Sequence, residues 1–148
     1  MELNFTHVGI TVSDLDASVK FYEEVFGFTC RNRTSFDENF LAQAPDLYKL
    51  TNTTANVAFV SAPNGIVLEM FQFIPSLPDN GLFAWNRPGY THICLTLDNL
   101  PEFAEHMRAH NVQFCMDVLK RWDGGHWVFV KDPDGNLIEV NEPMQPKK

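Results

Sequence analysis

Two histidines and two glutamates stand at equivalent places in the two halves of this chain. His7 and His92 lie in the first strand-like segment of each half, and Glu69 and Glu139 lie in the last. An ionised carboxylate amid aliphatic neighbours needs a charge partner or a metal, because unpaired burial costs several kcal/mol or forces protonation. Two imidazoles and two carboxylates are a ligand set that suits one divalent ion, whose charge the carboxylates neutralise.

The composition of this ligand set limits the ion and its chemistry. Absence of cysteine argues against a closed structural zinc site and for Ni, Co, Mn, Fe or Zn at an open site. Such an ion polarises a carbonyl and stabilises an enediolate, while Glu139 or Glu69 shuttles a proton at the carbon alpha to it. The alternative is that both histidines are core residues and the glutamates pair with arginines. The repeated placement favours the metal.

Alternating and helical hydrophobic patterns define the elements that position these four residues. Capping-box spacing of Ser13 and Asp16 predicts a helix that Gly27 ends, and Asn99 and Glu102 have the same spacing before a second helix. A hairpin is expected through the turn Pro63-Asn64-Gly65. The expected strands are Leu3–Val12, Phe28–Thr34, Asn56–Ser61, Ile66–Phe73, Tyr90–Leu97, Val112–Met116, Trp127–Lys131 and Asn136–Val140.

The two halves repeat one plan of strand, helix and three strands. An offset of 85 places His7 on His92, and an offset of 70 places Glu69 on Glu139. The difference between the two offsets assigns extra length to the first half. In that half, Ser35 to Thr54 lacks hydrophobic periodicity and has room for one helical turn. We therefore expect modules at 1–80 and 81–148 that together form one structural domain.

Composition excludes several classes of partner. The chain has 148 residues, a net charge of -8 and a pI near 4.9, which argues against nucleic acid and anionic membrane surfaces. No apolar run has membrane-spanning length and no signal peptide is recognisable, so a cytoplasmic location is expected. The three cysteines form no paired motif and are expected to be reduced core thiols.

The remaining polar and aromatic residues carry weaker expectations. His126 matches Asn56 in the repeat and is expected at the surface, with a second acid or base as the alternative. Segments 35–54 and 74–89 are candidate lids. Solvated positions are expected for His106, His110, Arg31, Arg33, Lys49 and Arg87, and core or interface positions, with a pocket lining as the alternative, for Phe71, Phe73, Trp85, Trp122 and Trp127.

The chain resembles the vicinal oxygen chelate superfamily, which includes glyoxalase I, methylmalonyl-CoA epimerase, extradiol dioxygenases and fosfomycin- and bleomycin-resistance proteins. The resemblance is carried by HVGITVSDLDASVKFYEEVFGF, GIVLEMFQF, YTHICLTLDNL and DPDGNLIEVNEP. It implies an α+β fold of two tandem βαβββ modules that form an open, cup-shaped mixed β-sheet around a metal. The family's ligand positions fall on His7, Glu69, His92 and Glu139.

The resemblance also implies an activity. Four intact ligands are most similar to glyoxalase I, a metal-dependent lyase acting on a glutathione hemithioacetal, with Glu139 and Glu69 as catalytic residues. One alternative is a methylmalonyl-CoA epimerase-like enzyme acting on an acyl-CoA thioester; another is a ligand-binding or resistance protein without catalysis. A dioxygenase fits less well, because Glu69 occupies a position that those enzymes leave open. The resemblance further implies a homodimer, with the site inside one chain or shared between two.

Overall fold

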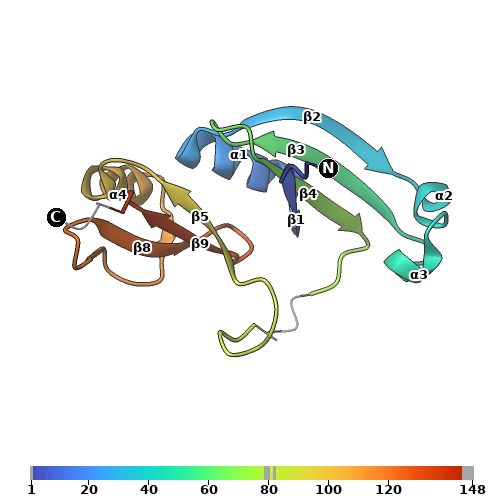
Figure 1. Ribbon diagram of the computed structural model, residues 1–148. Helices are drawn as coiled ribbons and strands as arrows, with labels where there is room; N and C mark the ends of the chain where they lie inside the picture. Colours follow the sequence, from blue (N-terminus) through green and yellow to red (C-terminus); the bar gives the residue numbers. More distant parts are fainter. Residues whose placement is uncertain (1, 79–80, 82, 145–148) are drawn as a thin grey trace. The chain divides into compact units, whose positions relative to one another are not determined.

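The computed structural model describes residues 2–78, 81 and 83–144, and the chain divides into two compact units, Met1–Asp79 and Asn80–Lys148. Each unit has its own β-sheet (Figure 1). The elements of the first unit are β1 (His7–Thr11), α1 (Leu15–Phe26), β2 (Thr29–Phe36), α2 (Glu38–Leu41), α3 (Pro45–Tyr48), β3 (Thr54–Ser61) and β4 (Val67–Ile74).

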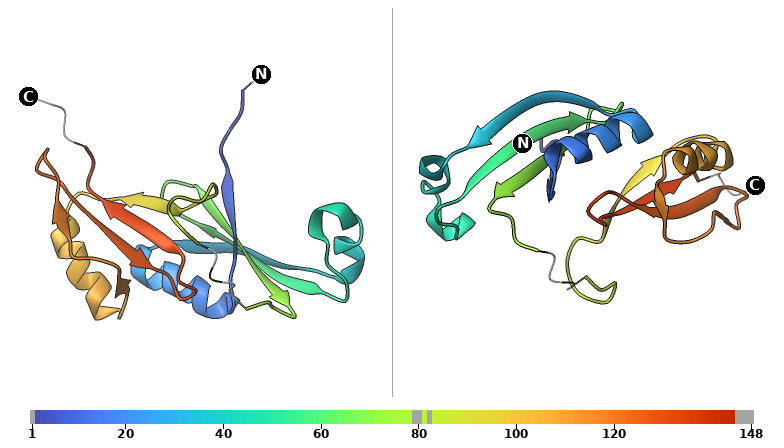
Figure 2. Two further views of the ribbon diagram at one scale, coloured as in Figure 1. Left: turned by 90° about the horizontal axis from the view of Figure 1, so that it is seen from below. Right: turned by 180° about the vertical axis from the view of Figure 1, so that it is seen from behind.

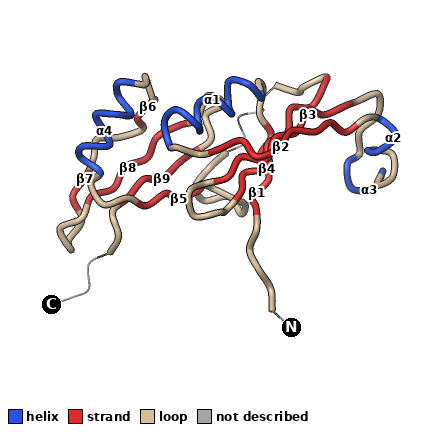
Figure 3. Tube along the Cα trace, turned by 90° about the horizontal axis from the view of Figure 1, so that it is seen from above, coloured by secondary structure: helices blue, strands red, loops and turns tan. Residues whose placement is uncertain are grey.

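The sheet of the first unit has the strand order β1-β4-β3-β2. β1 runs parallel to β4, while the other pairs are antiparallel. Val60 of β3 and Met70 of β4 are fully buried on the face that α1 covers (Figure 3). Val19 and Tyr22 of α1 are buried as well. Glu69 therefore lies on the face away from the helix.

The second unit repeats this arrangement with shorter outer strands. Its sheet has the order β5-β9-β8-β6, β5 runs parallel to β9, and α4 packs on β8 (Figure 2). Ile138 and Val140 of β9 are fully buried together with Leu100 and Met107 of α4. The elements are β5 (His92–Thr96), α4 (Leu100–Ala109), β6 (Gln113–Phe114), β7 (Leu119–Lys120), β8 (His126–Lys131) and β9 (Leu137–Asn141).

These elements confirm the predicted α+β class with mixed sheets, and several local predictions need correction. Asp14, not Ser13, caps α1 by accepting a hydrogen bond from the Ala17 N–H at 3.0 Å. The predicted strand from Leu3 begins only at His7, because β4 begins at Val67 directly opposite. The expected strand at Val112–Met116 shortens to two residues, and the excursion at 35–54 holds two short helices instead of one turn.

Other predictions are confirmed. Gly27 ends α1 in the left-handed conformation with φ 69°, and Asn99 caps α4 by accepting from the Glu102 N–H. The hairpin turns of both units also match, because the Gly65 N–H donates to Ala62 and the Gly135 N–H donates to Asp132. The repeat thus extends from the sequence to individual backbone hydrogen bonds.

Candidate metal-binding pairs

The first unit brings His7 and Glu69 together across two parallel strands. Gly9 lies opposite Glu69 in the register, so His7 is its diagonal neighbour on the same face. His7 Nε2 and Glu69 Oε2 are 3.4 Å apart, and Glu69 is largely shielded while His7 is half exposed. A side chain at Gly9 would meet the Phe71 ring at 3.4 Å, so glycine leaves the space beside Glu69 open.

The second unit builds the same pair in the same register. Cys94 lies opposite Glu139, and His92 is again the diagonal neighbour. His92 Nε2 and Glu139 Oε2 are 3.2 Å apart, and about a quarter of each side chain is exposed, 26% and 23%. Both pairs lie on the sheet face away from the unit's helix.

Both pairs have the spacing that two ligands of one ion require. Ligand atoms about 2.1 Å from an ion lie about 3.0 Å apart at a right angle and about 3.4 Å apart at the tetrahedral angle. The observed separations of 3.4 and 3.2 Å fall at or within this range. Among the described residues, no group of three or more His, Cys, Asp or Glu side chains is placed to hold a metal ion, so the structure shows two pairs and a four-ligand centre stays a prediction.

A threonine precedes each histidine and contacts its other ring nitrogen. Thr6 Oγ1 lies 3.0 Å from His7 Nδ1, and Thr91 Oγ1 lies 2.8 Å from His92 Nδ1. Partners of this kind hold an imidazole in one orientation and present its second nitrogen to a metal. The Thr-His dipeptide occurs at both positions in the sequence, so the repeat could have revealed it.

Polar groups surround Glu139 in addition to His92. The Asn141 amide donates to Glu139 Oε1 at 3.1 Å and to Cys94 Sγ at 3.2 Å, and the Thr96 hydroxyl donates to Asn141 Oδ1 at 3.0 Å. Desolvation, and then the charge of Glu139, raises the pKa of the Cys94 thiol to about 11. The thiol therefore stays protonated at neutral pH although Cys94 is exposed, not a core residue as expected.

Aromatic rings surround Glu69 instead. Phe71 occupies the place that Asn141 holds in the other unit; its ring stacks on Phe73 at 5.9 Å and tilts against Phe36 at 6.0 Å. Phe36 in turn stacks on Phe40 of α2 at 4.1 Å. Part of the excursion at 35–54 therefore packs onto the site face of the first unit.

Aromatic rings also border His92. Phe129 meets its ring edge-on at 5.0 Å, and Trp85 lies 5.8 Å away in a tilted arrangement. Trp85 itself contacts Phe129 at 5.5 Å and Phe83 at 5.7 Å. Trp85 is 58% exposed and Trp122 is 68% exposed, so neither is a core residue, and of the expected positions an interface or a pocket lining stays a prediction. The segment before β5 thus carries apolar surface next to the pair in the second unit.

His126 is not the surface residue that the sequence predicted. It begins β8, is half-buried, and its backbone N–H and Nδ1 both contact Glu142 Oε2, at 2.8 and 3.0 Å. Glu142 Oε1 accepts the backbone N–H of Leu100 at the start of α4 at 2.9 Å. Arg121 donates to the Glu142 carbonyl oxygen at 2.9 Å and pairs with Asp123. This network, which sequence reasoning missed, ties the end of β9 to α4.

Gln72 makes the equivalent contact in the first unit. Its Oε1 accepts the backbone N–H of Leu15 at 3.2 Å, and its Nε2 donates to the Ser13 carbonyl oxygen at 3.1 Å. The offsets of the repeat relate Leu15 to Leu100 and Gln72 to Glu142. A side-chain oxygen at the same repeat position therefore accepts the first backbone N–H of the helix in both units. The side chain is neutral in the first unit and charged in the second.

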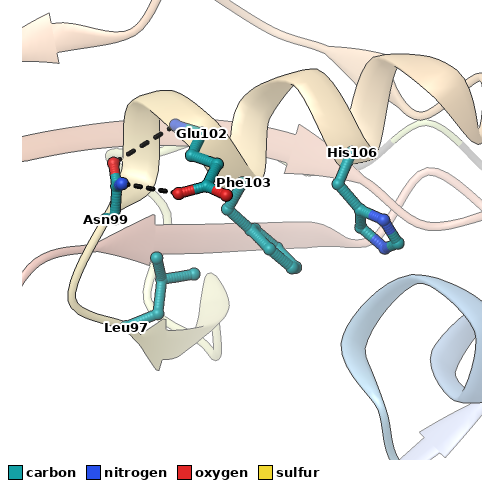
Figure 4. A pocket seen from close by; sticks show the side chains of 5 residues that line it. All are labelled: Leu97, Asn99, Glu102, Phe103 and His106. Atoms are coloured by element: carbon teal, nitrogen blue, oxygen red, sulfur yellow. Dashed lines mark hydrogen bonds between the residues drawn. The ribbon is translucent and has the colours of Figure 1, made fainter.

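A shallow pocket of about 390 Å³ lies beside α4 in the second unit, and no residue of either pair lines it (Figure 4). Asn99 and Glu102 are hydrogen-bonded to each other at its rim, and Phe103 and His106 point to the same side. His106 is half-buried beside Phe103 instead of solvated, whereas the expected exposure of His110 is confirmed. The four basic residues expected in solvent, Arg31, Arg33, Lys49 and Arg87, are exposed. No helix in the described part of the chain is long and apolar enough to cross a membrane.

Two of the curated relatives illustrate the match, which extends along nearly the whole chain. A lactoylglutathione lyase of Schizosaccharomyces pombe is 28% identical over 147 residues, which are 95% of this chain but 48% of the relative. The chain thus spans about half the length of that protein. A lactoylglutathione lyase of Pseudomonas putida is 29% identical over 152 residues, 94% of this chain and 84% of the relative.

Solved structures share the fold at low sequence identity. A glyoxalase family protein from Bacillus cereus has a TM-score of 0.81 at 21% identity and covers 98% of this chain and 97% of its own. Leishmania major glyoxalase I has a TM-score of 0.63 at 25% identity, with coverage of 95% and 87%. A mutant fosfomycin resistance protein from Listeria monocytogenes, complexed with Mn(II), has a TM-score of 0.64 at 17% identity, with coverage of 95% and 92%.

A family profile matches nearly the whole chain. The profile of the Glyoxalase/Bleomycin resistance protein/Dioxygenase superfamily matches residues 4–140, which include both pairs. The match confirms the resemblance noted in the sequence. The chain belongs to this superfamily.

Proposed function

We propose that the chain is a metal-dependent lyase of the glyoxalase I type, in which His7, Glu69, His92 and Glu139 bind one divalent ion. The observation that supports this most strongly is the repeated His–Glu pair, whose nitrogen–oxygen separations of 3.4 and 3.2 Å suit two ligands of one ion. The lactoylglutathione lyase relatives support the same activity. Ni, Co, Mn, Fe and Zn all suit this donor set.

The chain's own residues would divide the work between binding and proton transfer. A bound divalent ion supplies Lewis acidity for negative charge on oxygens next to the reacting carbon. His7 and His92 present Nε2, each oriented by the threonine at Nδ1. Glu139 or Glu69 accepts the proton when the C–H bond alpha to the carbonyl breaks, and returns it to the neighbouring carbon. The substrate is isomerised without any oxidant or reductant.

The test is turnover by protein reconstituted separately with Ni, Co, Mn and Zn. Methylglyoxal plus glutathione is the first substrate, and a chiral acyl-CoA thioester in D₂O is the second. We expect thioester formation from the first, abolished in Glu139→Gln and Glu69→Gln. Glu24→Gln is the matched control, because Glu24 is exposed on α1 and pairs only with Lys20 among the described residues.

Other outcomes would assign the site differently. Deuterium exchange on the acyl-CoA thioester without turnover of the first substrate would replace the lyase by an epimerase. Tight binding of a small molecule with no stoichiometric metal would replace catalysis by sequestration. A homodimer remains a prediction, and light scattering of the metal-loaded protein tests it. Metal retained by a pure monomer would place all four ligands in one chain.

A further inference from the structure

The two carboxylates of the proposed site are not held alike. Glu139 has a partner on each oxygen, His92 at Oε2 and Asn141 at Oε1. Glu69 contacts His7 through Oε2, and within the described residues no hydrogen bond to its Oε1 is present. The repeat sets Phe71 in the place of Asn141, and a phenyl ring has no N–H to donate.

The amide of Asn141 is itself oriented by a neighbour. The Thr96 hydroxyl donates to Asn141 Oδ1 at 3.0 Å, so the Nδ2 hydrogens face Glu139 and the Cys94 sulfur. Thr96 lies opposite Asn141 in the register of β5 and β9. The hydroxyl, the amide and the carboxylate therefore form a chain of hydrogen bonds along one face of the sheet.

We propose that Asn141, oriented by Thr96, is a positioning residue that fixes the Glu139 carboxylate with Oε2 toward the metal position. The inference rests on the proposed function, since it assigns a partner to one proposed ligand. Turning the carboxylate away from His92 breaks the Asn141 hydrogen bond, whereas Glu69 turns without such a loss. Partners of metal ligands contribute about 10–100-fold to metal affinity or activity.

Metal affinity of four variants tests the proposal by calorimetry with Ni²⁺, Co²⁺ and Zn²⁺ in turn. We expect Asn141→Leu and Thr96→Val to weaken binding about 10-fold or more, because each breaks the chain of hydrogen bonds. Thr96→Ser keeps the hydroxyl and should stay near wild type. Thr11→Val is the matched control, because Thr11 is the repeat counterpart of Thr96 and faces Phe71.

The results separate this proposal from the proposed function. Where turnover is measurable, kcat should fall in Asn141→Leu while KM stays unchanged, and melting temperatures should show that every variant folds. Metal affinity of Asn141→Leu equal to wild type, or equal loss in Thr96→Ser and Thr96→Val, would overturn the positioning role. Loss of affinity in a protein that never turns over methylglyoxal would support positioning and reject the lyase. A wild-type protein that binds none of the ions would overturn both.

Discussion

Replacing Glu142 by alanine should destabilise the second unit strongly. The carboxylate accepts three hydrogen bonds, from Leu100 N at 2.9 Å, His126 N at 2.8 Å and His126 Nδ1 at 3.0 Å. Buried hydrogen bonds to charged groups contribute about 1.5–3 kcal/mol each to stability. Because Glu142 is partly exposed, water bonds some of the N–H groups that the variant frees, and the loss is smaller than the sum. We expect a loss of about 3 kcal/mol in the free energy of unfolding for Glu142→Ala.

Glu142→Gln should lose less, because Gln72 shows that a glutamine accepts the first N–H of a helix in this position. A glutamine amide has a single oxygen, so it cannot accept the bond from Leu100 and also both bonds from His126. We therefore expect a loss of about 1–2 kcal/mol in the free energy of unfolding. Urea unfolding followed by tryptophan fluorescence measures both variants, since Trp85, Trp122 and Trp127 all lie in the second unit. Equal stability of wild type and Glu142→Ala would refute the anchoring role.

The same glutamate predicts a dependence on pH. Burial acts to raise the pKa of Glu142, but hydrogen bonds from Leu100 and His126 outweigh it and hold the pKa below its ordinary value of 4.5. A carboxylate whose pKa is lowered by folding contributes stability above 4.5, and this is lost as pH falls through the folded-state pKa. Wild type should therefore lose more stability below pH 4.5 than Glu142→Gln; parallel curves would contradict this.

Three further predictions follow from the site. Thr6→Val and Thr91→Val should each weaken metal binding about 10-fold or more in calorimetry, because each removes the contact to a histidine Nδ1, and unchanged affinity would exclude that role. Cys94 should react slowly with iodoacetamide at pH 8, since its thiol pKa is about 11, and mass spectrometry of labelled wild type and Cys94→Ala measures the rate; fast labelling at Cys94 would contradict the raised pKa. Chelation of a bound ion should lower the melting temperature of wild type but not of Glu139→Gln, because an ion that binds only the native state stabilises it.

The repeat is what made the candidate pairs predictable from sequence. A histidine or glutamate alone has many explanations, but an offset shared by several residues indicates the strand and the face of each. The sequence predicted the four residues as one ligand set, and the structure pairs His7 with Glu69 and His92 with Glu139, because the first and last strands of each unit are neighbours. The sequence also identified the Asn99 cap and the glycine turns, which depend on residues close along the chain.

What the sequence could not predict depends on contacts between distant segments. His126 and Glu142 meet because β8 and β9 are antiparallel, and nothing near His126 in the chain indicates a carboxylate 16 residues later. Ser13 and Asp14 both suit a helix cap, and only the backbone geometry selects Asp14. Leu3 and Phe5 alternate like a strand but lie before the start of the β1–β4 pairing, and no described strand pairs with them.

The unlike surroundings of Glu69 and Glu139 bear on the origin of such a chain. Hydrogen bonds that recur at matching places, such as those of Gln72 and Glu142, are what duplication of one ancestral unit would leave. Two copies of a single-unit ancestor would pair about a two-fold axis, so both carboxylates would have identical neighbours. Joining the copies in one polypeptide removes that constraint, and mutation can then act on one half alone. Asparagine at 141 against phenylalanine at 71 would be such a divergence, and it gives an amide partner to Glu139 but not to Glu69 among the described residues.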